Sequence, residues 1–263
     1  ISDGECVLFC GRSGCGKTTI TRLVNGLIPQ FYQGELQGRV LVDGQEISSR
    51  PMYQIAAKVG SVFQNPRTQF FNVDTDSEIA FGIENEARPP QELIERVEQT
   101  ADDLRIQKLR NRNIFELSGG EKQRCVLARQ LAKDPILFLA DEPTGTLDPS
   151  TADMVHKVLT DAVKDTGMTM VVTSHWPKAI EVLSDRAMWL DHGEVKMEGS
   201  PKEVSAEFMR GHEMHEESHV QVGQPLIKIN DVKRYYYSYT RGVVKAVDGV
   251  SLEVNEKEIV GLV

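Results

Sequence analysis

Eight residues near the start of the chain have the types and spacing of a phosphate-binding loop. The run Gly11-Arg12-Ser13-Gly14-Cys15-Gly16-Lys17-Thr18 follows an apolar segment, Glu5 to Cys10, and leads into a segment with helical character, Thr18 to Leu27. It matches the pattern G-x-x-x-x-G-K-[ST], in which glycines let backbone N–H groups close around phosphate oxygens. Lys17 would reach the β- and γ-phosphates, and the Thr18 hydroxyl would ligate Mg²⁺. The pattern predicts a site for MgATP formed by Gly11, Ser13, Gly14, Cys15, Gly16, Lys17, Thr18 and Thr19.

Two adjacent carboxylates, Asp141 and Glu142, follow a second apolar segment, Ile136 to Ala140. Adjacent residues that leave a strand point to opposite sides, so the two carboxylates can take different tasks. We expect Asp141 to hold Mg²⁺ through water, and Glu142 to orient or deprotonate the attacking water as a general base. An acidic pair in such a place is also common as a simple turn. Its combination with the phosphate-binding loop favours the catalytic interpretation.

The run Leu117-Ser118-Gly119-Gly120-Glu121 also has two interpretations. By itself it is a helix start, with Ser118 as the N-cap and Glu121 in the first turn. Its place shortly before the acidic pair resembles the ATP-binding cassette (ABC) ATPase family, whose signature is LSGGE or LSGGQ. In that family the signature binds the γ-phosphate of ATP held by a second cassette. The resemblance implies that Ser118, Gly119 and Gly120 contact the nucleotide of a second ABC domain, which would be an obligatory partner.

Three further residues match motifs of the same family. Gln64 corresponds to the Q-loop, which senses the γ-phosphate and the metal, and His175 to the switch histidine, which hydrogen-bonds the γ-phosphate. Asp148 corresponds to the D-loop, which crosses the interface between two cassettes. A histidine at a strand end is more often structural, but here the motifs occur in the complete family order. The resemblance implies a catalytic group of Glu142, His175 and Gln64 and metal ligands Thr18, Gln64 and Asp141.

The segments between these motifs predict an α/β fold. The apolar runs Ile136 to Ala140 and Met168 to Thr173 are separated by an amphipathic helix from about Ser150 to Lys164, which is typical of buried parallel strands in a doubly wound sheet. Arg39 to Asp43 and Lys58 to Phe63 also resemble strands, for which antiparallel pairing is plausible. We expect a P-loop NTPase of the ABC type, with a mainly parallel sheet, an antiparallel β part and a helical subdomain.

The helical subdomain is expected between the Q-loop and the signature. From Pro90 to Leu109 apolar residues recur at helical spacing among charged ones, which predicts exposed amphipathic helices. Phe70, Phe71 and Phe81 lie close to the Q-loop. They suit either a docking groove for a transmembrane partner or the domain's own core.

The chain is predicted to contain one cassette and part of another. We expect an ABC ATPase domain at 1–209 that lacks its first strands and adenine-stacking loop, an acidic linker at 210–224, and the opening strands of a second, truncated ABC domain at 225–263. Val254 to Val263 can be aligned with Ile1 to Cys10, each an apolar strand after a polar turn. The alternative is an ordinary two-stranded C-terminal extension.

Composition excludes several other classes of protein. The 263 residues are 40% hydrophobic with a net charge of −9, which argues against a nucleic-acid partner. No apolar run approaches the roughly 20 residues that cross a bilayer. The four cysteines, Cys6, Cys10, Cys15 and Cys125, indicate buried structural thiols in a reducing compartment better than disulfides or a metal site. We therefore expect a cytoplasmic protein.

Two finer resemblances divide the chain. Residues 1–116 resemble the ATPases of energy-coupling-factor importers, with phrases such as Val59-Gly-Ser-Val-Phe-Gln-Asn-Pro-Arg67. Residues 117–263 resemble the soluble twin-cassette ATPase of the methyl-coenzyme M reductase activation system, as in Thr173-Ser-His-Trp-Pro177. The first implies vitamin or cobalt/nickel uptake, a transmembrane transporter partner and a peripheral place on the inner face of the cell membrane. The second implies a metalloenzyme as partner.

Overall fold

The computed structural model describes residues 1–84, 88–211, 224–238 and 242–256. The chain divides into two units, Ile1–Glu213 and Met214–Val263. Most of the predicted linker, residues 212–223, and the last residues, 257–263, lie outside the described part of the chain. The first unit holds all the motifs found in the sequence.

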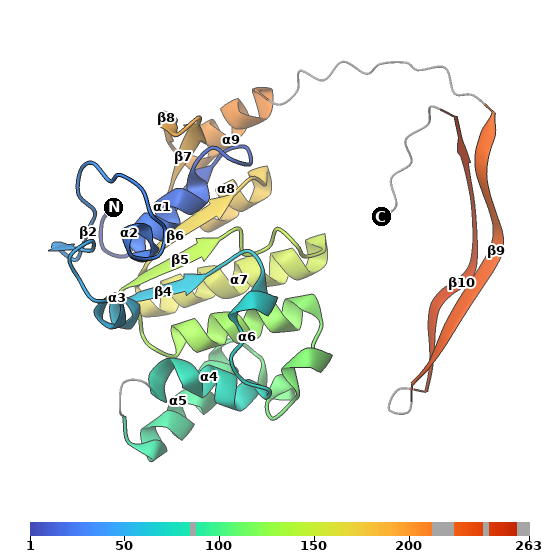
Figure 1. The fold of residues 1–263 in the computed structure, drawn as a ribbon, viewed down its shortest axis with the longest axis horizontal. Coiled ribbons are helices and arrows are strands. Elements are labelled where there is room, and N and C mark those ends of the chain that lie inside the picture. Colours follow the sequence, from blue (N-terminus) through green and yellow to red (C-terminus); the bar gives the residue numbers. More distant parts are fainter. Residues whose placement is uncertain (85–87, 212–223, 239–241, 257–263) are drawn as a thin grey trace. The chain divides into compact units, whose positions relative to one another are not determined.

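A six-stranded sheet forms the centre of the first unit (Figure 1), in the order β4-β5-β6-β1-β7-β8. Neighbouring strands from β4 to β7 pair in parallel, and β8 pairs antiparallel with β7. The carboxyl ends of the five parallel strands therefore lie at one edge of the sheet. The strands are β1 (Cys6–Cys10), β4 (Val59–Val62), β5 (Leu137–Asp141), β6 (Thr169–Ser174), β7 (Arg186–Asp191) and β8 (Glu194–Gly199).

Apolar side chains on both faces of the sheet explain why its strands are buried. Along β1, Leu8 belongs to one hydrophobic cluster and Val7 and Phe9 to another, as the alternation of a strand requires. Leu8 is fully buried, which stabilises the fold by roughly 1.5–3 kcal/mol relative to an exposed side chain. Helices cover both faces, so the predicted doubly wound arrangement is confirmed.

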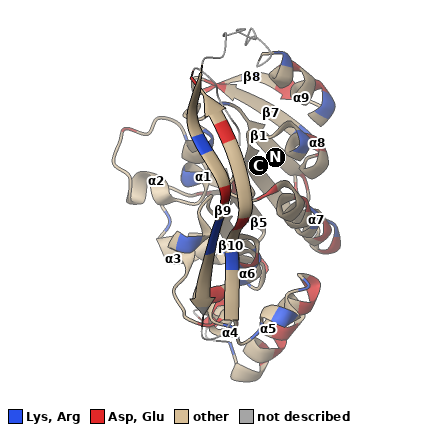
Figure 2. Cartoon of the chain, turned by 90° about the vertical axis from the view of Figure 1, so that its right-hand side faces the viewer, with Lys and Arg blue, Asp and Glu red and all other residues tan. Residues whose placement is uncertain are grey.

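The helices divide between the sheet and a helical subdomain. α4, α5 and α6 pack on one another at the end of the unit where β4 is the edge strand (Figure 1). α5 buries Val97 and Ala101 one turn apart and carries charges of both signs on its surface (Figure 2), which confirms the predicted amphipathic helix. The helices are α1 (Lys17–Val24), α2 (Leu27–Gln30), α3 (Met52–Lys58), α4 (Thr75–Glu84), α5 (Pro90–Asp103), α6 (Gly119–Leu131), α7 (Pro149–Thr166), α8 (Pro177–Leu183) and α9 (Pro201–Arg210), with 3₁₀ turns at Pro66–Gln69, Gln107–Leu109 and Ile114–Glu116.

The antiparallel pairing suggested for residues 39–43 and 58–63 is wrong. β4 pairs in parallel with β5 at one edge of the six-stranded sheet. Val59 and Val62 are buried in two different hydrophobic clusters, and burial on both faces is typical of strands in a parallel sheet. β2 (Leu41–Val42) instead pairs with β3 (Gln45–Glu46), its immediate successor in the chain. The two residues between them, Asp43 and Gly44, both have positive φ, which is the geometry of a tight hairpin turn.

The second unit consists, in its described part, of one long hairpin. β9 (Pro225–Ser238) and β10 (Gly242–Asn255) pair antiparallel, with register shifts along the pair. Apolar side chains such as Leu226, Tyr237 and Val243 are exposed by 69%, 84% and 55%. A two-stranded sheet of this kind has little core of its own and is marginally stable in isolation.

Candidate nucleotide-binding site

Four of the predicted site segments meet at the carboxyl edge of the parallel strands. The phosphate-binding loop follows β1, Gln64 follows β4, the acidic pair ends β5, and His175 follows β6. These four strands are neighbours in the sheet, in the order β4-β5-β6-β1. Side chains that leave them at the same edge can therefore contact one another, and this edge is where open parallel sheets bind ligands.

The phosphate-binding loop is held closed by its own lysine. Lys17 is buried, with 5% of its surface exposed, and its Nζ donates to the carbonyl oxygens of Gly11 at 2.8 Å and Arg12 at 3.0 Å. Gly11 must be a glycine, because a Cβ there would lie 2.4 Å from the Leu190 carbonyl oxygen. Gly16 has a φ of 109° and leads directly into α1. The backbone thus forms a tight turn at a helix N-terminus, the arrangement that binds phosphate.

The other residues of the predicted loop differ in their exposure. Cys15 is buried, Thr18 is half-buried, and Ser13, Gly14 and Thr19 are exposed. The Cys15 thiol lies 3.9 Å from the Lys17 amine. Gly14 has a φ of 82° and nothing within 4 Å of the place of a Cβ, so its side of the loop is open to a ligand.

Glu142 is the point at which the groups of this edge converge. One carboxylate oxygen, Oε2, accepts a hydrogen bond from Gln64 Nε2 at 2.9 Å and lies 3.4 Å from His175 Nδ1. The other, Oε1, lies 3.5 Å from the Lys17 amine. The structure therefore brings together the predicted general base, Q-loop glutamine, switch histidine and phosphate-binding lysine.

A neighbouring indole orients His175. Trp176 Nε1 donates a hydrogen bond to His175 Nε2 at 3.0 Å. An indole nitrogen can only donate, so Nε2 must be the acceptor and the neutral ring carries its proton on Nδ1, facing Glu142. The motifs of the sequence did not indicate this role of Trp176, although a tryptophan directly after a strand-end histidine is a possible signal.

Thr173, which the sequence analysis also missed, fixes the acidic pair. Its Oγ1 donates to Asp141 Oδ1 at 2.6 Å and accepts from the Glu142 backbone N–H at 2.9 Å. Glu142 has a φ of 46°, a left-handed conformation that is unusual for its residue type. The threonine thus holds Asp141 in place and stabilises the turn that presents Glu142.

The donor atoms at this edge suit Mg²⁺. Thr18 offers a hydroxyl, Asp141 a carboxylate, and Gln64 an amide oxygen, since its amide nitrogen is the atom that contacts Glu142. Hard oxygen donors of these kinds are the ligands that Mg²⁺ prefers. The residues present therefore fit the metal that the sequence predicted.

The predicted signature lies elsewhere, at the start of α6. Ser118 and Glu121 form a reciprocal capping box, with Ser118 N–H donating to Glu121 Oε2 at 2.8 Å. Gly120 must be a glycine, because a Cβ there would lie 2.1 Å from Thr151 Cγ2 on α7. Among the described residues, no hydrogen bond or ion pair joins Ser118, Gly119 or Gly120 to the phosphate-binding loop.

The signature instead lies beside the predicted D-loop. A Cβ on Gly119 would lie 3.7 Å from Leu147 Cδ2, directly before Asp148. The Asp148 side chain is the N-cap of α7 and accepts from Thr151 N–H at 3.0 Å and Ser150 Oγ at 2.6 Å. The Ser150 hydroxyl bond holds the pKa of Asp148 well below its usual range. Asp148 is therefore a carboxylate that orders its own helix start.

The four cysteines are all buried with free thiols, as the sequence indicated. Burial raises the pKa of Cys6, Cys10 and Cys125 to about 12. These three thiols are protonated at neutral pH and pack as small apolar groups.

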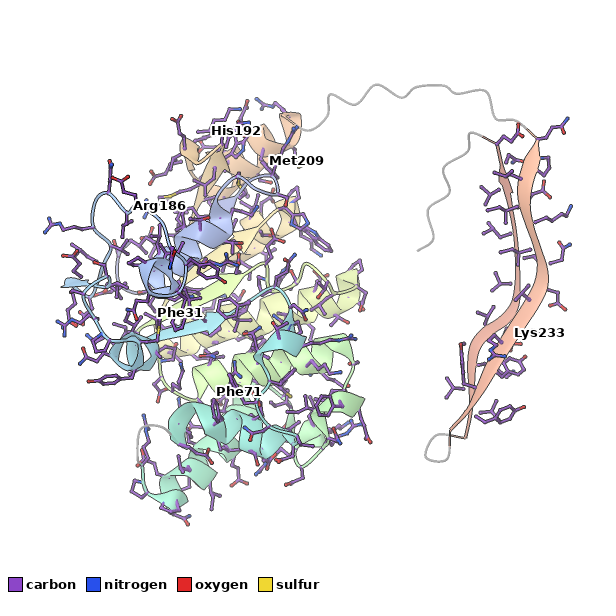
Figure 3. The ribbon with its side chains drawn as sticks, in the orientation of Figure 1. Phe31, Phe71, Arg186, His192, Met209 and Lys233 are labelled. Atoms are coloured by element: carbon purple, nitrogen blue, oxygen red, sulfur yellow. The ribbon has the colours of Figure 1, made fainter. Side chains whose placement is uncertain are left out.

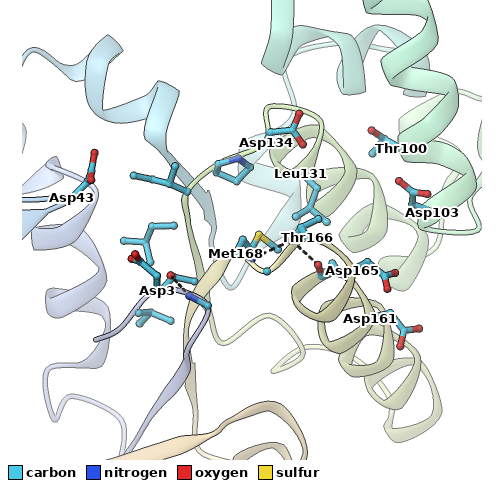
Figure 4. A pocket seen from close by; sticks show the side chains of 18 of the residues that line it. Asp3, Asp43, Thr100, Asp103, Leu131, Asp134, Asp161, Asp165, Thr166 and Met168 are labelled. Atoms are coloured by element: carbon cyan, nitrogen blue, oxygen red, sulfur yellow. Dashed lines mark hydrogen bonds between the residues drawn. The ribbon is translucent and has the colours of Figure 1, made fainter.

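A large cavity lies at the opposite edge of the sheet (Figure 4). It measures about 870 Å³ and is lined by residues at the amino ends of the strands, among them Gly4, Ile136 and Thr169. Several aspartates surround it, including Asp3, Asp43, Asp103, Asp134, Asp161 and Asp165. No predicted site residue lines this cavity, and its negative charge opposes the binding of phosphates.

Comparison with known proteins gives the family. Residues 1–145 match the sequence profile of the ABC transporter family. The chain therefore belongs to the ABC transporter family and contains an ABC ATPase cassette. Among the described residues, no helix is both long and apolar enough to cross a bilayer.

Two curated relatives cover large parts of the chain. A provisionally named ABC transporter ATP-binding protein of Treponema denticola is 45% identical over 74% of this chain and 40% of its own length. An uncharacterised ABC transporter ATP-binding protein of Methanocaldococcus jannaschii is 33% identical over 100% of this chain and 54% of its own length. The chain thus spans about half the length of these relatives, or less.

Two solved structures share the fold. CbiO1 of Clostridium perfringens, part of the ABC transporter complex cbiONQ, has a TM-score of 0.71 and 30% identity, covering 79% of this chain and 81% of that one. The ATP-binding cassette MJ0796, a dimer in a post-hydrolysis state with ADP and Pi, has a TM-score of 0.66 and 26% identity, covering 76% and 87%. The expected fold class is therefore confirmed.

Proposed function

We propose that this chain binds MgATP at the carboxyl edge of its sheet and hydrolyses it when paired with a second cassette. The observation that carries the proposal is the convergence of Lys17, Gln64 and His175 on the Glu142 carboxylate. These are the groups that hydrolysis requires at one place: a cation for phosphate, a base for water, and polar side chains that sense the reacting phosphate.

Each residue has a distinct task in this mechanism. Lys17 exchanges its contact with Glu142 for the phosphate oxygens, which releases the carboxylate to take a proton from the attacking water. His175 presents its Nδ1 proton on the same side and stabilises negative charge that develops on the transferred phosphoryl group. Bound Mg²⁺, held by Thr18, Asp141 and Gln64, would offset the phosphate charge.

The second half of the site would come from the signature of another cassette. Ser118 and Glu121 satisfy each other, whereas the amides of Gly119 and Gly120 belong to the first turn of α6 and have no partner within the helix. Such amides bind anions well, so they suit the γ-phosphate of a nucleotide held opposite. The dimeric state of the similar cassette MJ0796 supports this pairing.

We infer that residues 225–263 are the opening strands of a second cassette, after a cassette at 1–209 and a linker at 210–224. The exposed apolar side chains of β9 and β10 support this, because a hairpin of this kind needs a larger domain to cover it. The greater length of the relatives, and the match of the M. jannaschii protein over the whole chain, are consistent with a tandem parent.

The target that the similarities favour is an energy-coupling-factor importer for a vitamin, cobalt or nickel, with the cassette on the inner face of the cell membrane. CbiO1, which belongs to a transporter complex, supports this choice. Phe71 adds a structural argument: it is exposed by 71% (Figure 3) and stacks on Phe81 with ring centroids 4.8 Å apart. Phe70, in contrast, packs against the hydrophobic core. An exposed phenylalanine that stacks on a half-buried one suits a membrane partner.

The test is co-purification of the full-length parent with membranes. Phe71→Ser should reduce the membrane-bound fraction and leave nucleotide binding intact, because Phe71 lies outside the phosphate site. The matched control is Tyr53→Ser, which changes an aromatic of 72% exposure on α3. A membrane-bound fraction that Phe71→Ser leaves unchanged would contradict the docking role. A wild-type parent that stays in the soluble fraction with a metalloenzyme would support the alternative, the soluble twin-cassette activation ATPase.

A further inference from the structure

A buried histidine on α7 contacts the turn that carries the catalytic carboxylate. His156 is 3% exposed, and its Nε2 lies 3.0 Å from Oγ1 of Thr144, which is 4% exposed. Thr144 is two residues after Glu142 in the chain. Within the described residues, the other ring nitrogen, Nδ1, has no hydrogen-bond partner. A buried nitrogen without a hydrogen-bond partner costs free energy, so the presence of this histidine calls for an explanation. The bond to Thr144 offers one.

The turn in question connects the general base to the D-loop. Gly145 N–H donates to the Glu142 carbonyl at 3.1 Å, and Leu147 N–H donates to the Thr144 carbonyl at 3.1 Å. A Cβ on Gly145 would lie 3.4 Å from Glu142 Oε2, so the turn packs directly behind the carboxylate. At its first residue the turn is fixed to β6, through Glu142 N–H and Thr173 Oγ1 at 2.9 Å.

His156 supplies the second attachment of this turn. The chain leaves the turn at Asp148, enters α7 and returns His156 to Thr144 two turns later. The other hydrogen bonds of the segment between Glu142 and Asp148 lie within the turn or at its ends, and Leu147 packs against the core, so the His156 bond ties the middle of the turn to α7. We propose that His156 is a positioning residue: its hydrogen bond to Thr144 fixes the turn that presents Glu142 to the attacking water and Asp148 to the second cassette.

In this buried place the ring is more stable neutral than protonated, and its Nε2 can donate to the Thr144 hydroxyl. A protonated ring would carry an N–H on both nitrogens and leave the buried Nδ1–H without an acceptor. Burial lowers the pKa of His156, Asp153 on its own helix opposes this, and Lys178 on α8 adds to it. Asp153 and Lys178 also pair with each other at 2.7 Å. The ring is therefore neutral around pH 7, and its protonation in acid, below the ordinary pKa of about 6.5, works against the buried position of the ring.

The test uses three single variants and one double variant of the full-length parent. His156→Leu and Thr144→Val remove the bond, whereas His156→Gln keeps a polar nitrogen near Nε2 and removes the titration. We expect the first two to lower kcat about tenfold with less than a twofold change in KM for ATP, because misplacement of a base affects the chemical step. The double variant should be no worse than either single one. His156→Gln should restore most of the rate and flatten the acid limb of the kcat profile. The difference between the kcat profiles of wild type and His156→Gln isolates His156.

Val155→Ala is the control for simple loss of packing, since Val155 is fully buried beside His156 on the same helix. If it lowers kcat as much as His156→Leu does, the role is merely structural and the proposal is wrong. Because the ATPase activity is itself proposed, a second readout does not depend on it. Amide hydrogen exchange at residues 144–148 in the nucleotide-free chain should increase at least tenfold in His156→Leu and not in His156→Gln. Unchanged exchange in His156→Leu would overturn the proposal whether or not ATP is hydrolysed.

Discussion

The carboxyl edge of the sheet and the start of α6 use their polar groups in opposite ways. At the carboxyl edge, three side chains that follow neighbouring strands contact the Glu142 carboxylate. At the start of α6, Ser118 and Glu121 bond to each other, and no side chain of the phosphate-binding loop reaches them among the described residues. The carboxyl edge holds the groups for catalysis. The start of α6 holds the backbone N–H groups of Gly119 and Gly120, which have no partner within the helix.

This difference favours a divided site, in which one cassette holds the nucleotide and a second cassette contributes its signature. A helix start that satisfies its own side chains is stable without a ligand and needs no partner for folding. Its remaining amides can bind only an anion that comes from outside the unit. The comparison therefore predicts that changes at the two regions have separable effects: the first on nucleotide binding and chemistry, the second on pairing.

The largest expected effect is on the chemical step. Glu142→Gln removes the base but retains the shape and the contact with Gln64, so turnover in the full-length parent should fall by about 10²–10⁴. Binding of MgATP should remain, measured by equilibrium titration with a fluorescent nucleotide. A variant that hydrolyses ATP at the wild-type rate would remove Glu142 from the mechanism.

A smaller effect is expected on nucleotide binding. Lys17→Ala removes the buried cation that faces Glu142, and we expect MgATP to bind roughly 10–100-fold more weakly, since a charge-assisted contact to phosphate is worth about 1.5–3 kcal/mol. Titration of the same fluorescent nucleotide measures the change. Arg12→Ala is a suitable control, because Arg12 is an exposed residue of the same loop. Equal binding by wild type and Lys17→Ala would show that phosphate binds elsewhere.

The smallest expected effect concerns the capping box. Ser118→Ala should lower the free energy of unfolding by about 1 kcal/mol. Ser200→Ala is a matched control, because Ser200 and Glu203 form the same box on α9. The two variants should lose similar stability, but only Ser118→Ala should weaken ATP-dependent pairing. Equal effects on pairing would mean that Ser118 acts only through helix stability.

The capping box also predicts a dependence on pH. The Ser118 N–H bond lowers the pKa of Glu121, so the ionised carboxylate stabilises the folded state. This stabilisation is complete above the ordinary glutamate pKa of about 4.3 and is lost as the pH falls through the lowered value. In Glu121→Gln the free energy of unfolding should fall less between pH 5 and pH 3 than in wild type, as chemical denaturation at each pH can measure. An identical fall in both proteins would exclude Glu121 as a source of acid sensitivity.

The sequence predicted the strands well because they carry strong local signals. Apolar runs bounded by glycines and carboxylates specify β1 and β5 within one residue. The pairing of β4 was wrong, because a short apolar strand carries no local record of its neighbour. The strand that pairs with β4 is decided by the rest of the sheet, which local apolar periodicity does not describe.

The contacts that orient the site residues were not predictable in the same way. Thr173 lies within an apolar strand, and His156 lies about two turns into α7, the helix that follows the acidic pair and the D-loop. Their roles arise from contacts 31 and 12 residues apart in the chain, between Thr173 and Glu142 and between Thr144 and His156. Only the fold brings these atoms together, so residue type and spacing indicate nothing about them.

The most direct test of the divided site is the mass of the chain in solution with MgATP. Sedimentation of Glu142→Gln should show a monomer with ADP and a dimer with MgATP, because ATP that is not hydrolysed holds two cassettes together. The double variant Glu142→Gln/Ser118→Arg should bind MgATP and remain a monomer, since its signature is blocked while its phosphate-binding loop is intact. A double variant that dimerises as well as Glu142→Gln alone would contradict the account.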